Sequence, residues 1–338
     1  MRVAILSPVA WRTPPVHYGP WEQMASNLAE ELVKLGVEVT LFATGDSLTS
    51  GKLNAVIEKG YETTKGQDAK VLECLHISNL MENAANFDII HNHFDFLPLT
   101  YSKLIDTPMM TTIHGFSSEQ IIPVYQKYNA NTSYVSISNA DRHEKLDYLA
   151  TVYNGLNTAD FTLNNRPKDQ LLFFGRIHPH KGTKEAIAIA MQTNKKLIIA
   201  GIIQDQNYFD KEVAPHLNNE IQFIGHAGPQ KRDQLMGSSV ALLHPISFDE
   251  PFGLSVAEAM MCGTPVIAFN RGSMPELIEH GTTGFLVSTV AQANKAVQEL
   301  SQINRSQCSA KAKSRFSAET MAKKYLELYH QILKKEIV

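Results

Sequence analysis

Several motifs that would assign this chain to common nucleotide-binding classes are absent from its 338 residues. There is no G-x-G anywhere, so the G-x-G-x-x-G loop that lets a dehydrogenase backbone approach a pyrophosphate closely is missing. The stretch "GDSLTSGKL" is not a phosphate-binding P-loop, because five residues separate Gly45 from Gly51 and Leu53 stands where Ser or Thr is required. The two best-known glycine-loop nucleotide sites are therefore excluded.

Cysteine is scarce and long apolar runs are missing. The three cysteines are widely spaced, with no C-x-x-C pair, which predicts reduced thiols in a cytoplasmic protein. No apolar run approaches the roughly 20 residues of a membrane span. The opening "MRVAILSPVAW" predicts a buried strand ended by Pro8, because a signal peptide would need a longer apolar segment and a cleavage site.

The chain also lacks an excess of positive charge. Its formal net charge is −3, which argues against a nucleic-acid binder that relies on bulk positive charge. Apolar residues make up 43% and charged residues 19%, a balance typical of soluble globular proteins. At this length two domains are expected.

What is present is an alternation of strand and helix patterns. Short apolar strands are expected within "RVAILSP", "EVTLFA", "FDIIHNHF", "MMTTIH" and "SYVSIS" in the first half. Strands in the second half are expected within "LLFFGRI", "KLIIAG", "IQFIGH", "VALLHPI", "TPVIAFN" and "TGFLV". Amphipathic segments such as "EQMASNLAEELVKLG" and "KEAIAIAMQT" lie between them. This rhythm predicts an α/β protein with two Rossmann-like, doubly wound parallel-sheet domains, whose ligand site lies at the carboxyl ends of the strands.

The polar, Asn-rich stretch 154–170 is expected to link the two domains. The N-terminal domain is expected over 1–160 and the C-terminal domain over 168–316. A final helix is expected over 317–338, with an apolar face.

Three histidines lie at the ends of two expected strands. "HNHFD" puts His91, His93 and Asp95 on one face of a strand, by its period of two. A zinc site would need further ligands that are not apparent, so a polar patch facing the ligand cleft is favoured. His114, at the end of "MMTTIH", either faces the cleft or is a satisfied buried imidazole, and spacing alone does not choose between them.

A basic pair follows the first strand of the second half. In "FFGRIHPHKGTKEA", Gly175 ends a buried strand, Arg176 and Lys181 follow, and Gly182 precedes a helical pattern. Two cations beside a helix N-terminus favour a phosphate or pyrophosphate. A solvated basic loop is the alternative.

Two glutamates flank a turn in "FDEPFGLSVAEAM". Pro251 and Gly253 place Glu250 in a loop and start a helix near Leu254 or Ser255. Ser255 and Glu258 then fit a capping box, S-x-x-E. In the functional interpretation, amides near Gly253 face a phosphate, Glu258 accepts hydrogen bonds from ribose hydroxyls, and Glu250 lies nearer the group attached to the phosphate.

Taken together, these segments resemble glycosyltransferase family 4, the retaining sugar-nucleotide transferases with the GT-B fold. "EPFGLSVAE" matches the E-x7-E motif of that family and "GRIHPHKG" its phosphate-binding Arg/Lys segment. "TVYNGLNTADF" resembles the entry into the second domain, and "GTPVIAFNRGSMPELIEHGTTGFLV" resembles the last βαβ region. The match covers nearly the whole chain, and it implies that the final helix over 317–338 packs back on the N-terminal domain. One departure is Pro20 in "YGPWEQ", where many relatives have a second glycine, which stiffens the loop and removes an amide donor.

The resemblance implies a role for each of these positions. Arg176 and Lys181 would bind the diphosphate, Glu250 the donor sugar and Glu258 the ribose, while His226 and Ala227 would lie near the base. The implied catalytic residues are Arg176, Lys181, Glu250 and His114. The implied donor-binding residues are Gly19, Pro20, Gly175, His226, Ala227, Phe252, Gly253, Leu254, Ser255 and Glu258.

The resemblance also predicts a reaction without a metal ion, because the D-x-D motif of metal-dependent GT-A transferases is absent. A hexosyl group would pass from a UDP- or GDP-sugar to an acceptor hydroxyl with retention at the anomeric carbon. No cofactor or nucleic-acid partner is expected. The acceptor is left open among carbohydrates, lipid-linked compounds and small molecules, as is peripheral contact with a membrane.

Two alternatives remain at this point. A sugar-nucleotide 2-epimerase has the same two-domain architecture, and would convert a UDP-sugar without an acceptor. A two-domain ligand-binding protein of the periplasmic type would bind without turnover. The Glu250/Glu258 motif favours transfer over the epimerase. The Arg/Lys site and the expected lack of a signal peptide argue against the binding protein.

Overall fold

The structure is a computed structural model that describes residues 1–335. The chain divides into two compact units. Unit 1 comprises residues 1–156 with the final helix α11 (Ala318–Lys335), and unit 2 comprises residues 157–317. The expected final helix extended to residue 338, and its positions 336–338 lie outside the described residues.

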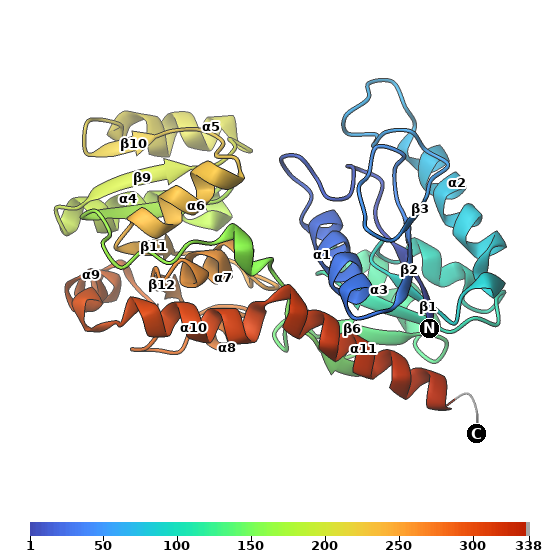
Figure 1. Cartoon of the computed structure of the whole chain (residues 1–338). Helices are drawn as coiled ribbons and strands as arrows, with labels where there is room; N and C mark the ends of the chain where they lie inside the picture. The colour runs from blue at the N-terminus through green and yellow to red at the C-terminus, as the bar shows by residue number, and fades with distance from the viewer. Residues whose placement is uncertain (336–338) are drawn as a thin grey trace. The chain divides into compact units, whose positions relative to one another are not determined.

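Unit 1 is built on a seven-stranded parallel sheet, in the order β3-β2-β1-β4-β5-β6-β7 (Figure 1). Its strands are β1 (Arg2–Leu6), β2 (Glu38–Phe42), β3 (Lys52–Asn54), β4 (Ile89–Asn92), β5 (Met109–Ile113), β6 (Ser133–Ser136) and β7 (Tyr148–Thr151). Its helices besides α11 are α1 (Pro20–Lys34), α2 (Ala69–Glu82) and α3 (Ile122–Lys127). The order changes direction at β1 and β4, so this unit is doubly wound.

The central strand β1 of unit 1 contributes side chains to two separate buried clusters. Val3 and Ile5 join one buried cluster with α1 and α11, whereas Ala4 and Leu6 join a second cluster with α2. Successive side chains of a strand point to opposite faces, so a wholly apolar strand needs cover on both. α11 packs on α1 and provides part of the cover on the first face.

Unit 2 has a six-stranded parallel sheet, in the order β10-β9-β8-β11-β12-β13. Its strands are β8 (Gln170–Phe174), β9 (Lys196–Ala200), β10 (Ile221–Phe223), β11 (Ala241–His244), β12 (Val266–Phe269) and β13 (Gly284–Val287). Its helices are α4 (Thr183–Gln192), α5 (Gln206–Tyr208), α6 (Pro229–Ser238), α7 (Leu254–Met261), α8 (Met274–Leu277), α9 (Val290–Glu299) and α10 (Arg305–Phe316). The order reverses between β8 and β11, where folds of this kind bind ligands beyond the carboxyl ends of the strands.

Two strands were not anticipated from the sequence, and both lie at edges of the first sheet. β3 pairs only with β2, and β7 only with β6. Their residues are exposed or half-buried rather than alternately buried. An edge strand is covered on fewer sides, so it lacks the apolar pattern by which strands are recognised.

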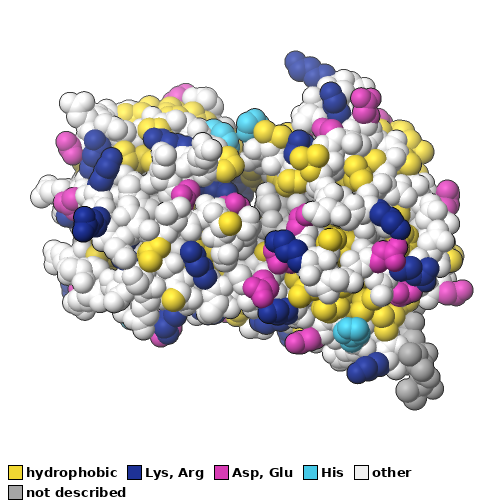
Figure 2. Space-filling model, viewed as in Figure 1, with side chains coloured by type: hydrophobic (Ala, Val, Ile, Leu, Met, Phe, Trp, Pro, Cys, Tyr) yellow, Lys and Arg dark blue, Asp and Glu magenta, His cyan; other side chains and the backbone are white. Residues whose placement is uncertain are grey.

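Among the residues described, no helix is long and apolar enough to cross a membrane. On the face seen in Figure 2, lysine and arginine side chains are interspersed with aspartate and glutamate. That face therefore offers no continuous basic surface of the kind that binds nucleic acid by charge.

Candidate functional site

The candidate site in unit 2 begins where two loops follow the neighbouring strands β8 and β11. Lys181 closes a short 3-10 helix (Pro179–Lys181) just before Gly182 and α4. Gly182 has φ +76°, and a Cβ there would collide with the carbonyl oxygen of Pro245, which follows β11. The Ser247 amide donates to the carbonyl oxygen of His180 at 2.9 Å. Glycine at position 182 therefore lets the Lys181 segment lie against the loop that carries Glu250.

Lys181 and Glu250 form an ion pair across these two loops. Each side chain is only about 15% exposed, and the Lys181 ammonium also lies 4.6 Å from the centre of the Phe248 ring. His244 Nε2 lies 3.7 Å from Glu250 Oε2. Burial lowers the pKa of His244 to about 4, so this imidazole is neutral at pH 7 and Lys181 is the cation that balances Glu250.

A third segment, 270–274, is hydrogen-bonded to the loop that carries Glu250. The Ser273 amide donates to the Glu250 carbonyl oxygen at 3.0 Å, and the Ser273 hydroxyl donates to the Phe252 carbonyl oxygen at 2.7 Å. Gly272 has φ +52°, and a Cβ there would collide with the backbone of Glu250. Backbone hydrogen bonds and a close glycine contact therefore set the position of the Glu250 carboxylate.

This contact leads to a testable prediction at Gly272. We expect Gly272→Ala to displace Glu250 and to lower the rate of the sugar transfer implied by the resemblance by about tenfold or more, since ångström-scale misplacement of a reacting group is costly. Gly281→Ala is the matched control, because Gly281 also has positive φ (+76°) but nothing lies within 4 Å of its Cβ position. Both variants share the backbone strain of alanine at positive φ. Equal turnover in the two variants, measured at matched folded fractions, would contradict the proposed role of Gly272.

The helix α7 begins beside Glu250 without a side-chain cap. Gly253 is its N-cap with φ +89°, and the first helical residue is Leu254. The capping box expected from Ser255 and Glu258 is therefore wrong, because the helix starts two residues too early for Ser255 to be the cap. The amides of Leu254 and Ser255 have no acceptor within the helix, as at any helix start, and carry the positive end of its dipole.

Glu258 pairs with an arginine that the sequence did not single out. Its Oε1 lies 2.8 Å from Nη1 of Arg232 on α6, and the Glu258 side chain is 7% exposed. Burial raises the pKa of Glu258, while the positive charge of Arg232 opposes that rise. The partner of Glu258 is thus a cation on a neighbouring helix.

The other residues of unit 2 that were expected to bind the donor lie at the same edge of its sheet. The Gly175 amide donates to Ala200 at the end of β9, and Arg176 Nη1 donates to Gln204 Oε1 at 2.9 Å. His226, exposed, and Ala227, buried, follow β10. The carboxyl ends of β10, β9, β8 and β11 follow one another along the sheet, so these residues and the loops that carry Lys181 and Glu250 lie at one edge of it.

Gly19, Pro20 and His114 belong to unit 1. Gly19 is the N-cap of α1 and Pro20 its first residue, where proline is favoured because the missing amide needs no partner. Glu22 in the same turn is buried, which raises its pKa to about 7. His114 Nε2 lies 2.9 Å from His93 Nδ1, and the His114 ring stacks on Trp21 at 5.7 Å.

The expectation of a polar patch at "HNHFD" is wrong. β4 ends at Asn92, so Asp95 does not continue the strand. His91 and His93 are fully buried, and His91 contacts the hydroxyls of Tyr329 at 2.6 Å and Thr112 at 2.7 Å. Burial lowers the pKa of His91 to about 3. His91 is a neutral core residue that is covered by α11.

No group of three or more His, Cys, Asp or Glu side chains within residues 1–335 is arranged to hold a metal ion. Sequence reasoning also missed Arg232, Gln204, Phe248 and Ser273. The only local signal among them was the aromatic Phe248 beside Glu250, because the partners of the others lie elsewhere in the chain.

Comparisons with known proteins identify the family and the fold of this chain. Residues 22–159 match the family model described as Glycosyltransferase Family 4, and residues 157–320 match Glycosyl transferases group 1. The glycogen synthase of Mycobacterium tuberculosis is 24% identical, with 82% of this chain and 80% of the relative aligned. A Komagataeibacter xylinus protein named GDP-mannose:cellobiosyl-diphosphopolyprenol alpha-mannosyltransferase is 25% identical, over 75% of this chain and 74% of that protein.

Solved structures show the same fold. Anabaena HepE, crystallised with UDP and glucose, has a TM-score of 0.74 at 19% identity, with 98% of this chain and all of HepE covered. The two family models together span both units. The chain therefore belongs to the glycosyltransferases with the GT-B fold and is similar to family 4.

Proposed function

We propose that this glycosyltransferase moves a hexosyl group from a UDP- or GDP-sugar to an acceptor hydroxyl, with retention at the anomeric carbon and without a metal ion. The observation that carries the proposal is the Lys181–Glu250 ion pair beside the start of α7, with Arg176 following the neighbouring strand β8. The UDP and glucose bound by HepE and the GDP-mannose in the name of the Komagataeibacter relative support a nucleotide-sugar donor.

The charges in unit 2 suit a departing nucleoside diphosphate. Lys181 and Glu250 neutralise each other, while the Arg176 side chain donates to the neutral amide of Gln204. A diphosphate at the α7 N-terminus would meet Arg176, Lys181 and the amides of Leu254 and Ser255. Glu250 would then be available to bind hydroxyls of the donor sugar. Preorganised charge of this kind acts most strongly as negative charge develops on the leaving group.

The proposed reaction needs no covalent enzyme intermediate. The bond between the anomeric carbon and the β-phosphate oxygen breaks, and the electron pair goes to the diphosphate. The acceptor oxygen bonds to the same face of the oxocarbenium-like sugar, and its proton passes to the departing phosphate oxygen. The protein contributes position and electrostatic stabilisation.

Three further assignments complete the proposed donor site. Glu258 would bind the ribose hydroxyls, His226 and Ala227 would contact the base, and the backbone near Gly175 and Phe252 would lie against the diphosphate and sugar. The contributions of Gly19, Pro20 and His114 stay predictions. So do a cytoplasmic location, the identity of the acceptor and any contact with a membrane surface.

A panel of UDP-, GDP- and ADP-sugars tests the proposal. Without acceptor, we expect slow release of free nucleotide from one donor class, unaffected by EDTA, because lysine and arginine supply the positive charge. NMR of the transferred product should show the anomeric configuration of the donor. Loss of activity in EDTA with rescue by Mn²⁺ would contradict metal independence. An epimerised sugar nucleotide would favour the 2-epimerase, and binding without turnover would favour a binding protein.

A further inference from the structure

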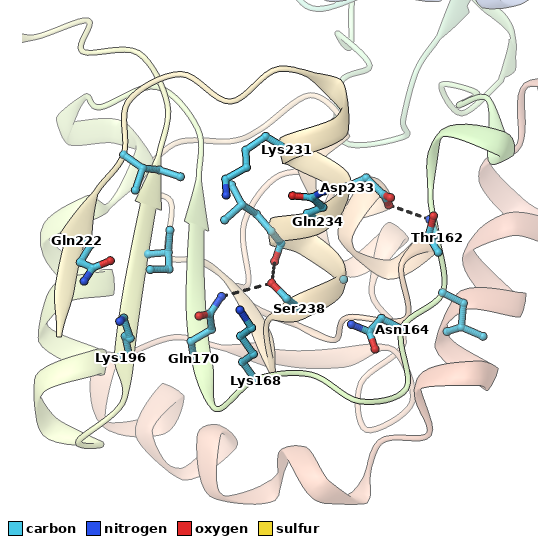
Figure 3. A pocket seen from close by; sticks show the side chains of 15 residues that line it. Thr162, Asn164, Lys168, Gln170, Lys196, Gln222, Lys231, Asp233, Gln234 and Ser238 are labelled. Carbon is cyan, nitrogen blue, oxygen red and sulfur yellow. Dashed lines mark hydrogen bonds between the residues drawn. The ribbon is translucent and has the colours of Figure 1, made fainter. Parts of the chain in front are cut away.

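Unit 2 contains a second concave region, separate from the candidate site, which we call the side groove. It has a volume of about 690 Å³, within the range of small-molecule sites of about 300–1,000 Å³. One wall is a face of β8, β9 and β10, another is α6, and the segment 162–168 lies at its side (Figure 3). None of its lining residues belongs to the set expected to bind the donor.

The strand wall of the side groove is a mixed polar and apolar surface. Gln170 on β8 is the register partner of Lys196 on β9, and Ile198 on β9 is the partner of Gln222 on β10. Lys196 and Ile198 are two residues apart and therefore share one face of the sheet. A sheet face that packs against a helix is normally apolar, so amides and an ammonium here indicate a face that stays in contact with solvent.

Three lysines line the side groove without a charge partner. Within residues 1–335, no carboxylate lies within 4 Å of the ammonium groups of Lys168, Lys196 or Lys231. The lining carboxylate is Asp233, whose Oδ1 already accepts from the Thr162 amide at 2.8 Å and from the Cys262 thiol at 3.3 Å. The side groove is therefore positively charged in a chain whose net charge is −3.

The positive charges are spread along the side groove. Figure 3 shows Lys168 and Lys196 near the ends where β8 and β9 begin, and Lys231 on α6 nearer the opposite end. Figure 3 shows the Gln170 amide between Lys196 and Lys168, and the Gln222 amide beyond Lys196 on the edge strand β10. A compact anion would bind best where the charges converge on one point. Separated charges with amides beside them suit an elongated ligand that carries acidic groups at intervals.

We propose that the side groove binds an acidic oligosaccharide. The lysines would contact its carboxylate, phosphate or sulfate substituents, and the side chains of Asn164, Gln170, Gln222, Gln234 and Ser238 would hydrogen-bond its hydroxyls. A planar lipid surface fits a concave region poorly. The lining has no aromatic side chain on which a nucleic-acid base could stack.

The side groove is separate from the residues that are proposed to carry out sugar transfer. Where the acceptor is itself such a polymer, a second contact would raise its effective concentration at the enzyme; that consequence rests on the proposed function. The binding itself does not, and can be measured without donor or turnover.

Titration calorimetry of the full chain in low salt with a tetramer of galacturonic acid tests the proposal. The test variant is Lys168→Gln/Lys196→Gln/Lys231→Gln. Its control, Lys211→Gln/Lys295→Gln/Lys334→Gln, removes the same charge from exposed lysines that do not line the side groove. We expect the tetramer to bind the unmodified chain and the control variant with the same affinity. Its affinity for the test variant should be lower by about tenfold or more. Donor hydrolysis should be unchanged in both variants.

Each other outcome overturns the proposal. Absent binding, or equal binding to the test and control variants, excludes the side groove as the site. Equally tight binding of neutral maltotetraose or of inorganic phosphate would show that acidic sugars are not the ligand. Binding of anionic phospholipid vesicles that depends on the three lysines, with no binding of the tetramer, would assign the side groove to a membrane surface.

Discussion

Replacing Lys181 with alanine should lower the rate of sugar transfer by roughly 10²-fold or more, the scale of losing one preorganised charge-stabilising donor. Lys181 is the cation paired with Glu250, and its ammonium lies beside the start of α7. The loss should appear in kcat at saturating donor, because the leaving diphosphate gains charge in the transition state. Lys184→Ala is the matched control, since Lys184 is exposed and pairs with Glu212.

Arg176→Ala should give a loss of similar size by the same reasoning. Its side-chain contact is with the amide of Gln204 on an exposed part of the surface, so little stability should change. Transfer rates close to normal in both Lys181→Ala and Arg176→Ala would contradict the assignment of these residues to the diphosphate. Circular dichroism measures the folded fraction of Lys181→Ala. A normal folded fraction with a lower transfer rate shows a loss of catalysis, whereas a lower folded fraction shows misfolding.

Replacing Arg232 with methionine should lower the free energy of unfolding by about 3 kcal/mol at pH 7.5. The change leaves the Glu258 carboxylate buried without its cation, which is the costly way to break a buried ion pair. In the variant the folded-state pKa of Glu258 should rise further above its unfolded value of about 4.3. A carboxyl whose pKa is raised by folding costs stability as the pH rises above its unfolded pKa. The difference in free energy of unfolding between Arg232→Met and the unmodified chain should therefore be largest at pH 7.5 and small near pH 4.5. Urea unfolding at both values measures it.

Glu258→Gln separates the stability of the pair from the binding of nucleotide. We expect affinity for the donor nucleotide to fall by about tenfold, because a charged acceptor for the ribose hydroxyls becomes neutral. The double variant Arg232→Met/Glu258→Gln should regain stability over Arg232→Met, since no buried charge is left unpaired, but it should not regain affinity. Unchanged affinity in Glu258→Gln would show that Glu258 has a structural role only.

Much of the fold was predictable because the central strands of both sheets are buried on two faces. Such strands appear as continuous apolar runs between helical patterns, and every one of them was anticipated. β3 and β7 were missed because edge strands do not require that pattern. The resemblance to GT-B glycosyltransferases could also be recognised from the sequence, because the phosphate-binding segment and the E-x7-E segment are each continuous in the chain.

The sequence by itself determined which loops carry the candidate residues, since the carboxyl end of a parallel strand is a local feature. Only the tertiary structure decided their partners. Ser255 and Glu258 have the spacing of a capping box, yet the helix begins at Leu254 and Glu258 pairs with Arg232. His91 has the position of an exposed strand end, yet α11, from the far end of the chain, covers it. Local periodicity says which face a side chain occupies, whereas the segment that covers that face depends on how distant elements pack.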